Sequence, residues 1–316
     1  MGTAPLHNEL AEGPEGGDAW WLNASDGVRL RVAHWPGAGK GTRKGTVLLF
    51  PGRTEYIEKY GRTADELNKR GYGTLVIDWR GQGLSDRLAH DLMLGHIDQF
   101  QDYQLDVQAM LGLAKTLDLP RPWYLMSHSM GGCIGLRALH QGLPVQAAAF
   151  SAPMWGLGIS PQLRPMAWAW SFASRYIGMD RHYAPGTKPE SYVLVAPFAG
   201  NSLTTDEDQW NYMAAQVDAI PELQLGGPSL RWLYEALLET RRLRAMTPPD
   251  MPVVTYLGGD EDVVDPGPVH RVMAHWPGGD MQVVAGAQHE FLMERPPLQT
   301  AFLDAVDRLF TENSGK

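Results

Sequence analysis

One serine of this sequence has the surroundings that a nucleophilic hydroxyl needs. Ser129 lies within SHSMGG (residues 127–132), between a short apolar run at 123–126 and a helical pattern of apolar residues. A strand that turns sharply into a helix around such a motif presents the central hydroxyl at the carboxyl end of a sheet. The turn strains the serine backbone, and small neighbours let the helix approach the strand. Ser127 stands where glycine is usual, and it is small enough to keep the turn plausible. The pattern therefore predicts that Ser129 is a nucleophile.

A serine hydroxyl needs a base, and the base needs an acid. The predicted base is His289, because it follows the last apolar run of the chain and can swing over the sheet edge. His128 adjoins the serine, but neighbouring side chains diverge on such a turn, so we expect it to pack or to support the site. The stretch GDEDVVD (259–265) follows the apolar run 253–257 and offers four carboxylates. One of them is expected to orient the imidazole and to stabilise its cation.

Attack by a serine also places negative charge on the carbonyl oxygen of the substrate, which preorganised N–H groups must stabilise. The backbone N–H of Met130, the residue after the serine, is one predicted donor. The loop after the apolar run 47–50 supplies the other, because Gly52 permits a sharp turn there and the Arg53 N–H follows it. The histidines show neither H-E-x-x-H nor ligand spacing, so we expect no metal.

Short apolar runs alternate with helical patterns from residue 46 onward, and these elements must position the candidate residues. The runs are continuous rather than alternating, which is typical of parallel strands that are covered on both faces. They lie at 47–50, 75–77, 123–126, 147–150, 253–257 and 281–285. The clearest helical pattern extends from about 98 to 117. Strands alternating with helices predict a doubly wound α/β sheet, and two N-terminal antiparallel strands, one at 28–35, bring the expected total to eight.

One stretch interrupts this alternation. Between Pro153 and Met246 we find no strand pattern but many tryptophans and methionines, with helical patterns at 165–176, 206–219 and 229–243. The sequence therefore predicts three parts. The N-terminal segment, residues 1–19, is expected to be disordered because it is rich in glycine and acidic residues. The α/β core consists of residues 20–153 and 247–316, and residues 154–246 form a helical cap.

Composition excludes several classes of protein. With 316 residues, 44% hydrophobic and 20% charged, the chain is an ordinary globular sequence. Its net charge of −9 disfavours nucleic acid as a partner. The single cysteine, Cys133, excludes a disulfide framework and fits a reducing compartment. The loop PGAGKGTRKG (36–45) is predicted to be a solvated connection, because its Lys40 is followed by glycine where a phosphate loop has serine or threonine.

No targeting signal or membrane span is evident, because the N-terminus lacks a basic and an apolar region and every apolar run is short. We therefore expect a cytoplasmic protein. Transient peripheral contact with the inner face of the membrane stays open through exposed aromatic residues of the cap, and the oligomeric state stays open too.

Four segments of the chain resemble the α/β-hydrolase superfamily and, within it, the monoacylglycerol lipase and bacterial lysophospholipase L2 group. They are FPGRTEY (50–56), DWRGQGLS (78–85), SHSMGG (127–132) and GAQHE (286–290). The resemblance extends from about residue 20 to 310, and the inserted stretch matches only in kind. The family often has histidine and glycine where this chain has Pro51 and Gly52, a difference that affects a side chain and not the backbone donor.

The resemblance also narrows the choice of acid. In similar enzymes the acid is followed by one variable residue, two apolar residues and often aspartate or proline. Laid on EDVVD (261–265), this frame indicates Glu261 rather than Asp260 or Asp262.

The resemblance further implies an α/β-hydrolase fold and cofactor-free hydrolysis of carboxylic esters through an acyl-enzyme, beneath a cap that holds one acyl chain. The implied substrates are lysophospholipids or monoacylglycerols. A small-ester esterase, a thioesterase, a perhydrolase or a C–C hydrolase could use the same triad. A catalytically silent binding protein on this fold is the remaining alternative, although such a protein would normally have lost a triad residue.

Overall fold

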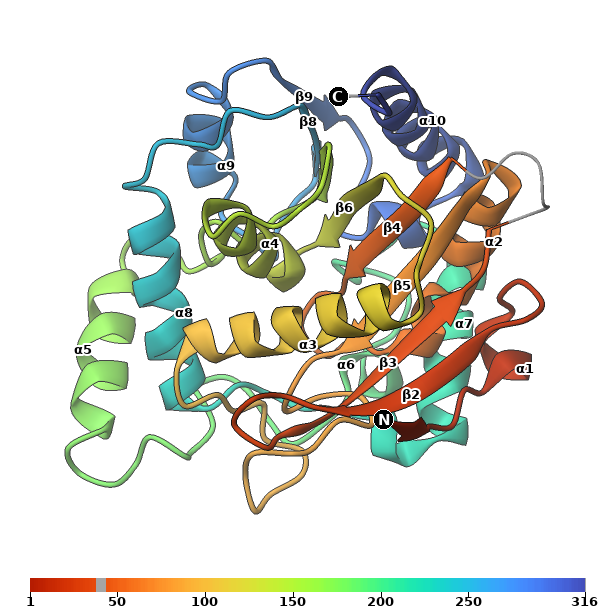
Figure 1. Ribbon diagram of the computed structural model, residues 1–316. Coiled ribbons are helices and arrows are strands. Elements are labelled where there is room, and N and C mark those ends of the chain that lie inside the picture. Colours follow the sequence, from red (N-terminus) through yellow and green to blue (C-terminus); the bar gives the residue numbers. More distant parts are fainter. Residues whose placement is uncertain (38–43, 316) are drawn as a thin grey trace.

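The computed structural model describes residues 1–37 and 44–315, and its centre is a nine-stranded sheet (Figure 1). The strand order is β1-β2-β3-β5-β4-β6-β7-β8-β9. β1 to β3 run antiparallel, β3 also pairs antiparallel with β5, and the remaining pairs are parallel. The strands are β1 Gly2–Thr3, β2 Asp18–Asn23, β3 Arg29–Trp35, β4 Gly45–Phe50, β5 Tyr72–Asp78, β6 Trp123–His128, β7 Ala148–Ser151, β8 Val253–Gly258 and β9 Gly279–Val284. The eight predicted strands are confirmed, and β1 is a ninth. The predicted loop at 36–45 lies largely outside the described residues.

The continuous apolar runs are buried because helices cover both faces of the sheet. Along β4, alternate residues point to opposite faces: Leu48 and Phe50 belong to one hydrophobic core, and Val47 and Leu49 to the other. The first core is closed by α3 (Tyr103–Thr116), α4 (Met130–His140) and α9 (Pro266–Met273), the second by α2 (Gly61–Lys69) and α10 (Pro296–Glu312). In Figure 1, α3 and α4 lie in front of the sheet. None of the described helices is long and apolar enough to cross a bilayer.

The stretch between β7 and β8 contains helices and no strand of the sheet among its residues. The helices are α5 (Arg164–Ser174), α6 (Tyr192–Val195), α7 (Glu207–Ala219) and α8 (Leu230–Leu243). Three of them match the predicted helical patterns, and the four-residue α6 was not predicted. α5 runs beside α8, where Trp168 meets Tyr234 edge to face with 6.0 Å between ring centres (Figure 1). Ser229 begins α8 as an N-cap that accepts a hydrogen bond from the Trp232 N–H.

The N-terminal segment 1–19 differs from the predicted disorder. It contains β1 and α1 (Asn8–Ala11), and Ala11 is fully buried. The Ala11 carbonyl accepts a hydrogen bond from the Tyr212 hydroxyl at 2.6 Å, and it lies so close to Gly61 that a Cβ there would overlap it. Composition alone predicted disorder because the segment is rich in glycine and acidic residues. The missing contribution is this close fit against α2 and α7, which only the folded chain provides.

Candidate active site

The sharp turn predicted around Ser129 is present between β6 and α4. Ser129 has φ 49° and ψ −117°, a left-handed conformation that costs a non-glycine residue free energy and that clusters at functional sites. Gly131 lies so close to the sheet that a Cβ would overlap the Phe50 carbonyl oxygen, and a Cβ at Gly132 would stand 2.6 Å from Pro153 Cβ. The two glycines therefore permit α4 to start directly against the sheet.

The structure brings His289 together with Glu261. His289 lies after β9, and its Nδ1 is 2.8 Å from Glu261 Oε2. The other carboxylate oxygen, Oε1, accepts backbone N–H groups of Val263 at 2.7 Å and Val264 at 3.0 Å. Both oxygens of Glu261 are thus held, so the carboxylate can fix the tautomer of His289 with a proton on Nδ1.

The other three carboxylates of this loop lie elsewhere. Asp260 and Asp262 are exposed. Asp265 caps the start of α9 by accepting the Gly267 N–H at 3.0 Å. Among these four acids, His289 therefore contacts Glu261.

Glu261 is buried, and its electrostatic surroundings favour the carboxylate. Burial alone would raise its pKa, but the hydrogen bond and charge of His289, with the N–H groups of Val264 and Val263, outweigh this and lower the pKa below its ordinary value. The carboxylate is therefore ionised at neutral pH, as a group that stabilises an imidazolium must be.

The predicted oxyanion donors lie at free backbone positions. The Gly52 N–H donates to the Glu55 carboxylate. The N–H groups of Arg53 and Met130 donate to no other described residue. Arg53 lies in the turn after β4, where Thr54 adopts φ 66°.

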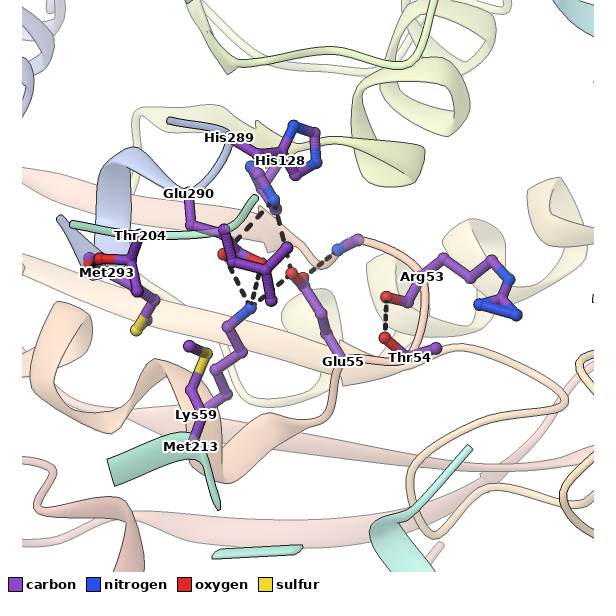
Figure 2. Close-up of polar contacts among 12 residues, drawn as sticks. Arg53, Thr54, Glu55, Lys59, His128, Thr204, Met213, His289, Glu290 and Met293 are labelled. Atoms are coloured by element: carbon purple, nitrogen blue, oxygen red, sulfur yellow. Dashed lines mark hydrogen bonds and ion pairs between the residues drawn. The ribbon is translucent and has the colours of Figure 1, made fainter. Parts of the chain in front are cut away.

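A buried polar cluster of Glu55, Lys59, His128 and Glu290 lies next to His289, and sequence reasoning did not find it (Figure 2). Lys59 Nζ donates to both Glu55 and Glu290 at 2.7 Å. His128 Nε2 faces the same two carboxylates at 3.5 and 3.4 Å, and its ring lies 4.7 Å from that of His289. Glu55 and Lys59 are four residues apart, just after the turn that carries Arg53, and this spacing was the available sequence signal of an ion pair. A charged pair at this spacing more often lies on a solvated face.

Charge balance explains why this cluster is tolerated in the interior. Burial lowers the pKa of His128, but Glu290 and Glu55 raise it by more, and the net shift is upward. Glu55, His128 and Glu290 could also offer ligand atoms to a metal, since these atoms lie within 4.8 Å of one another. The Lys59 ammonium already contacts both carboxylates, and it supplies the positive charge that a metal would bring.

A cavity of about 1170 Å³ opens above these residues, and both Ser129 and His289 line it. Most of its wall comes from the stretch between β7 and β8, and Arg53 and Thr54 from the loop after β4 also line it. The apolar side chains of this wall include Met154, Leu157, Met166, Trp170, Met213 and Trp232. A space of this size and polarity suits a ligand with a long apolar part.

Residues 41–296 match the family described as "Serine aminopeptidase, S33" (Hydrolase_4). The chain belongs to this family. This Hydrolase_4 chain is 31% identical to lysophospholipase L2 of Escherichia coli (strain K12). The alignment spans 300 residues and covers 91% of this chain and 84% of the relative. It is 25% identical to the probable lysophospholipase L2 of Haemophilus influenzae, over 93% of this chain and 92% of the relative.

Solved structures confirm the α/β-hydrolase fold of this Hydrolase_4 chain. A soluble variant of monoglyceride lipase from Saccharomyces cerevisiae, in complex with a substrate analog, has a TM-score of 0.72 at 21% identity and covers 93% of this chain and 95% of its own. Monoacylglycerol lipase from Paleococcus ferrophilus has a TM-score of 0.66 at 18% identity, with 89% and 98% covered. The resemblance predicted from sequence and the enzyme class, carboxylic ester hydrolase, are confirmed.

Proposed function

We propose that this α/β-hydrolase cleaves carboxylic esters of single-chain lipids, lysophospholipids or monoacylglycerols, with Ser129, Glu261 and His289 as its catalytic triad. One observation carries the proposal. Ser129 at the strained turn and His289, whose Nδ1 lies 2.8 Å from Glu261 Oε2, line the same large, mainly apolar cavity. A nucleophile, a base and an apolar binding space at one place are what acyl transfer from a lipid requires.

The proposed reaction proceeds in two halves. Ser129 Oγ attacks the ester carbonyl carbon while His289 Nε2 takes the hydroxyl proton, and Glu261 stabilises the imidazolium through Nδ1–H. The oxyanion accepts hydrogen bonds from the backbone N–H groups of Arg53 and Met130. His289 then protonates the leaving alcohol, which leaves an acyl-enzyme on Ser129. Water attacks this acyl-enzyme with His289 as base, the fatty acid departs, and the serine regains its proton.

The proposed cap, residues 154–246, would hold the acyl chain. Its apolar side chains dominate the cavity wall, and each buried methylene adds at most about 0.8 kcal/mol of binding free energy. In a series of p-nitrophenyl esters from acetate to palmitate, we expect kcat/KM to rise by up to about fourfold per methylene until the cavity is full.

A variant of the cavity wall sharpens this test. Leu233 is 9% exposed and lines the cavity, so Leu233→Trp should shorten the preferred acyl chain while the melting temperature shows that the fold survives. A steady decline of kcat/KM beyond acetate in the unmodified protein would contradict the lipid proposal and favour a small-ester hydrolase.

We further propose transient contact of the cap with the inner face of the membrane. The large apolar side chains at and after α5 and α6 are exposed, and they are Leu163, Met166, Trp170, Phe172, Tyr176, Ile177, Tyr192, Leu194 and Val195. Such a concentration of exposed apolar area marks interaction surfaces, and several of these residues also line the cavity through which a lipid would enter.

Vesicle sedimentation tests this contact. Phe172 and Ile177 are exposed and do not line the cavity, so the double variant F172S/I177S should reduce the fraction of protein that sediments with anionic phospholipid vesicles severalfold. Leu92→Ser, at a residue 63% exposed and remote in sequence from the cap, is the matched control and should sediment like the unmodified protein. Equal sedimentation of all three proteins would contradict the proposed contact.

A further inference from the structure

The Arg53 side chain carries a positive charge into the cavity without an acidic partner. Its Nη2 donates to the Gly226 carbonyl oxygen at 2.5 Å, and its Cζ lies 5.4 Å from the centre of the Trp232 ring. Gly226 and Trp232 both line the cavity, as Arg53 does. Arg53 Nε is buried and has no hydrogen-bond partner among the described residues. In Figure 2 the side chain points away from the cluster of Glu55, Lys59, His128 and Glu290.

Two other arginines of the described chain, Arg31 and Arg87, have their guanidinium groups hydrogen-bonded within the protein. Arg31 is bound by Glu58 and Asp78 at 2.7 Å each. Arg87 contacts no carboxylate, but it donates to four carbonyl oxygens, those of Gly81, Gly83, Glu222 and Gln224. Arg53 differs from both, since its one hydrogen bond to Gly226 leaves most of the guanidinium donors unused.

Such an arrangement costs stability and is retained where function requires it. Burial lowers the pKa of Arg53 to about 10, so the guanidinium is still cationic at neutral pH. A cation that is removed from water without a counter-ion is unfavourable unless an anion joins it. The planar fork of a guanidinium matches the oxygens of a phosphate group.

The Arg53 guanidinium is placed within reach of the head group of an ester that would react at Ser129. The backbone N–H of Arg53 is a proposed oxyanion donor, so the substrate carbonyl would lie at the base of this residue. As many covalent bonds separate an arginine backbone nitrogen from its Cζ as separate the carbonyl carbon of a 1-acyl lysophospholipid from its phosphorus. One residue could therefore meet the carbonyl oxygen with its main chain and the head group with its side chain.

We propose that the Arg53 side chain binds the phosphodiester group of a lysophospholipid head group and thereby selects lysophospholipids over monoacylglycerols. The inference rests on the proposed ester hydrolysis at Ser129 and adds the substrate class to it. A monoacylglycerol presents only hydroxyl groups at this position, and it would leave the guanidinium charge uncompensated in the complex.

The first test compares two substrates with the same acyl chain, a 1-acyl lysophosphatidylcholine and a 1-monoacylglycerol, both below their aggregation limits. We expect the ratio of their kcat/KM values to fall by about tenfold or more in Arg53→Met, and Arg53→Lys to restore part of it. Lys188→Gln is the matched control, because Lys188 also lies at the cavity wall but is 74% exposed at its side chain. Its ratio should stay within about twofold of the unmodified protein.

A second measurement separates head-group binding from a structural role. Glycerophosphocholine, the head-group product, should inhibit the unmodified enzyme competitively and lose this effect in Arg53→Met, with inorganic phosphate as a separate probe. The melting temperature of Arg53→Met should equal or exceed that of the unmodified protein, because a half-buried charge without an acidic partner has been removed.

The outcomes distinguish this inference from the proposed function. If the unmodified protein cleaves neither substrate, the proposed hydrolysis of single-chain lipid esters fails. If it cleaves both and the ratio in Arg53→Met is unchanged, or Lys188→Gln alters the ratio equally, the assignment to Arg53 is overturned. A lowered melting temperature with an unchanged ratio would assign Arg53 a structural role, and inhibition by inorganic phosphate that persists in Arg53→Met would place anion binding elsewhere.

Discussion

Replacing Ser129 by alanine is expected to lower kcat for ester hydrolysis by several orders of magnitude. The residual rate should be roughly 10³-fold over water, because the oxyanion donors and the binding cavity stay in place. Alanine removes only a hydroxyl from a residue that is 8% exposed, so circular dichroism and the melting temperature should change little.

His289→Ala provides the internal control for this result. It should cost a similar factor in kcat, and the double variant should be hardly worse than either single one, since the two residues act on the same proton. Near-normal ester hydrolysis by Ser129→Ala would show that the mechanism is wrong. Additive losses would show that Ser129 and His289 do not work together.

Replacing Glu261 by glutamine should lower kcat by up to about 10⁴. The change keeps the size of the side chain but removes the charge that would stabilise the imidazolium, and it places an amide where Oε2 now lies 2.8 Å from His289 Nδ1. Kinetics at saturating substrate would measure the loss, with folding checked by the melting temperature.

The neighbouring acid supplies a matched control for Glu261. Asp262→Asn removes a charge from the next residue, which is exposed, so we expect an effect on kcat within about twofold. A severe loss in Asp262→Asn together with a mild one in Glu261→Gln would show that Asp262, one position further along the chain, is the acid.

The strands could be predicted because their signal is local. An apolar run such as 47–50 requires cover on both faces, and β4 has it. The turn at Ser129 was predictable for the same reason, since strand, small residues and helix are adjacent in sequence. The choice of Glu261 needed more than the residues themselves, because four carboxylates stand in one loop and only the resemblance ranked them. The structure places that residue against His289.

Features that depend on contacts between distant segments could not be predicted. Glu290 adjoins His289 in sequence, but nothing local indicates that its carboxylate meets Lys59, more than two hundred residues away. The burial of Ala11 against α2 and α7 has the same origin. Arg53 was predicted for its backbone N–H, whereas the isolation of its guanidinium follows from the way Gly226 and Trp232 fold over it.

Labelling with a fluorophosphonate tests the central proposal, an activated nucleophile at Ser129, most directly. The serine oxygen would attack phosphorus and expel fluoride, and mass spectrometry of the intact protein followed by peptide mapping would locate the adduct. We predict one adduct per chain on Ser129, and none in Ser129→Ala under the same conditions. A folded protein that stays unlabelled, or an equal adduct in Ser129→Ala, would contradict the proposed mechanism.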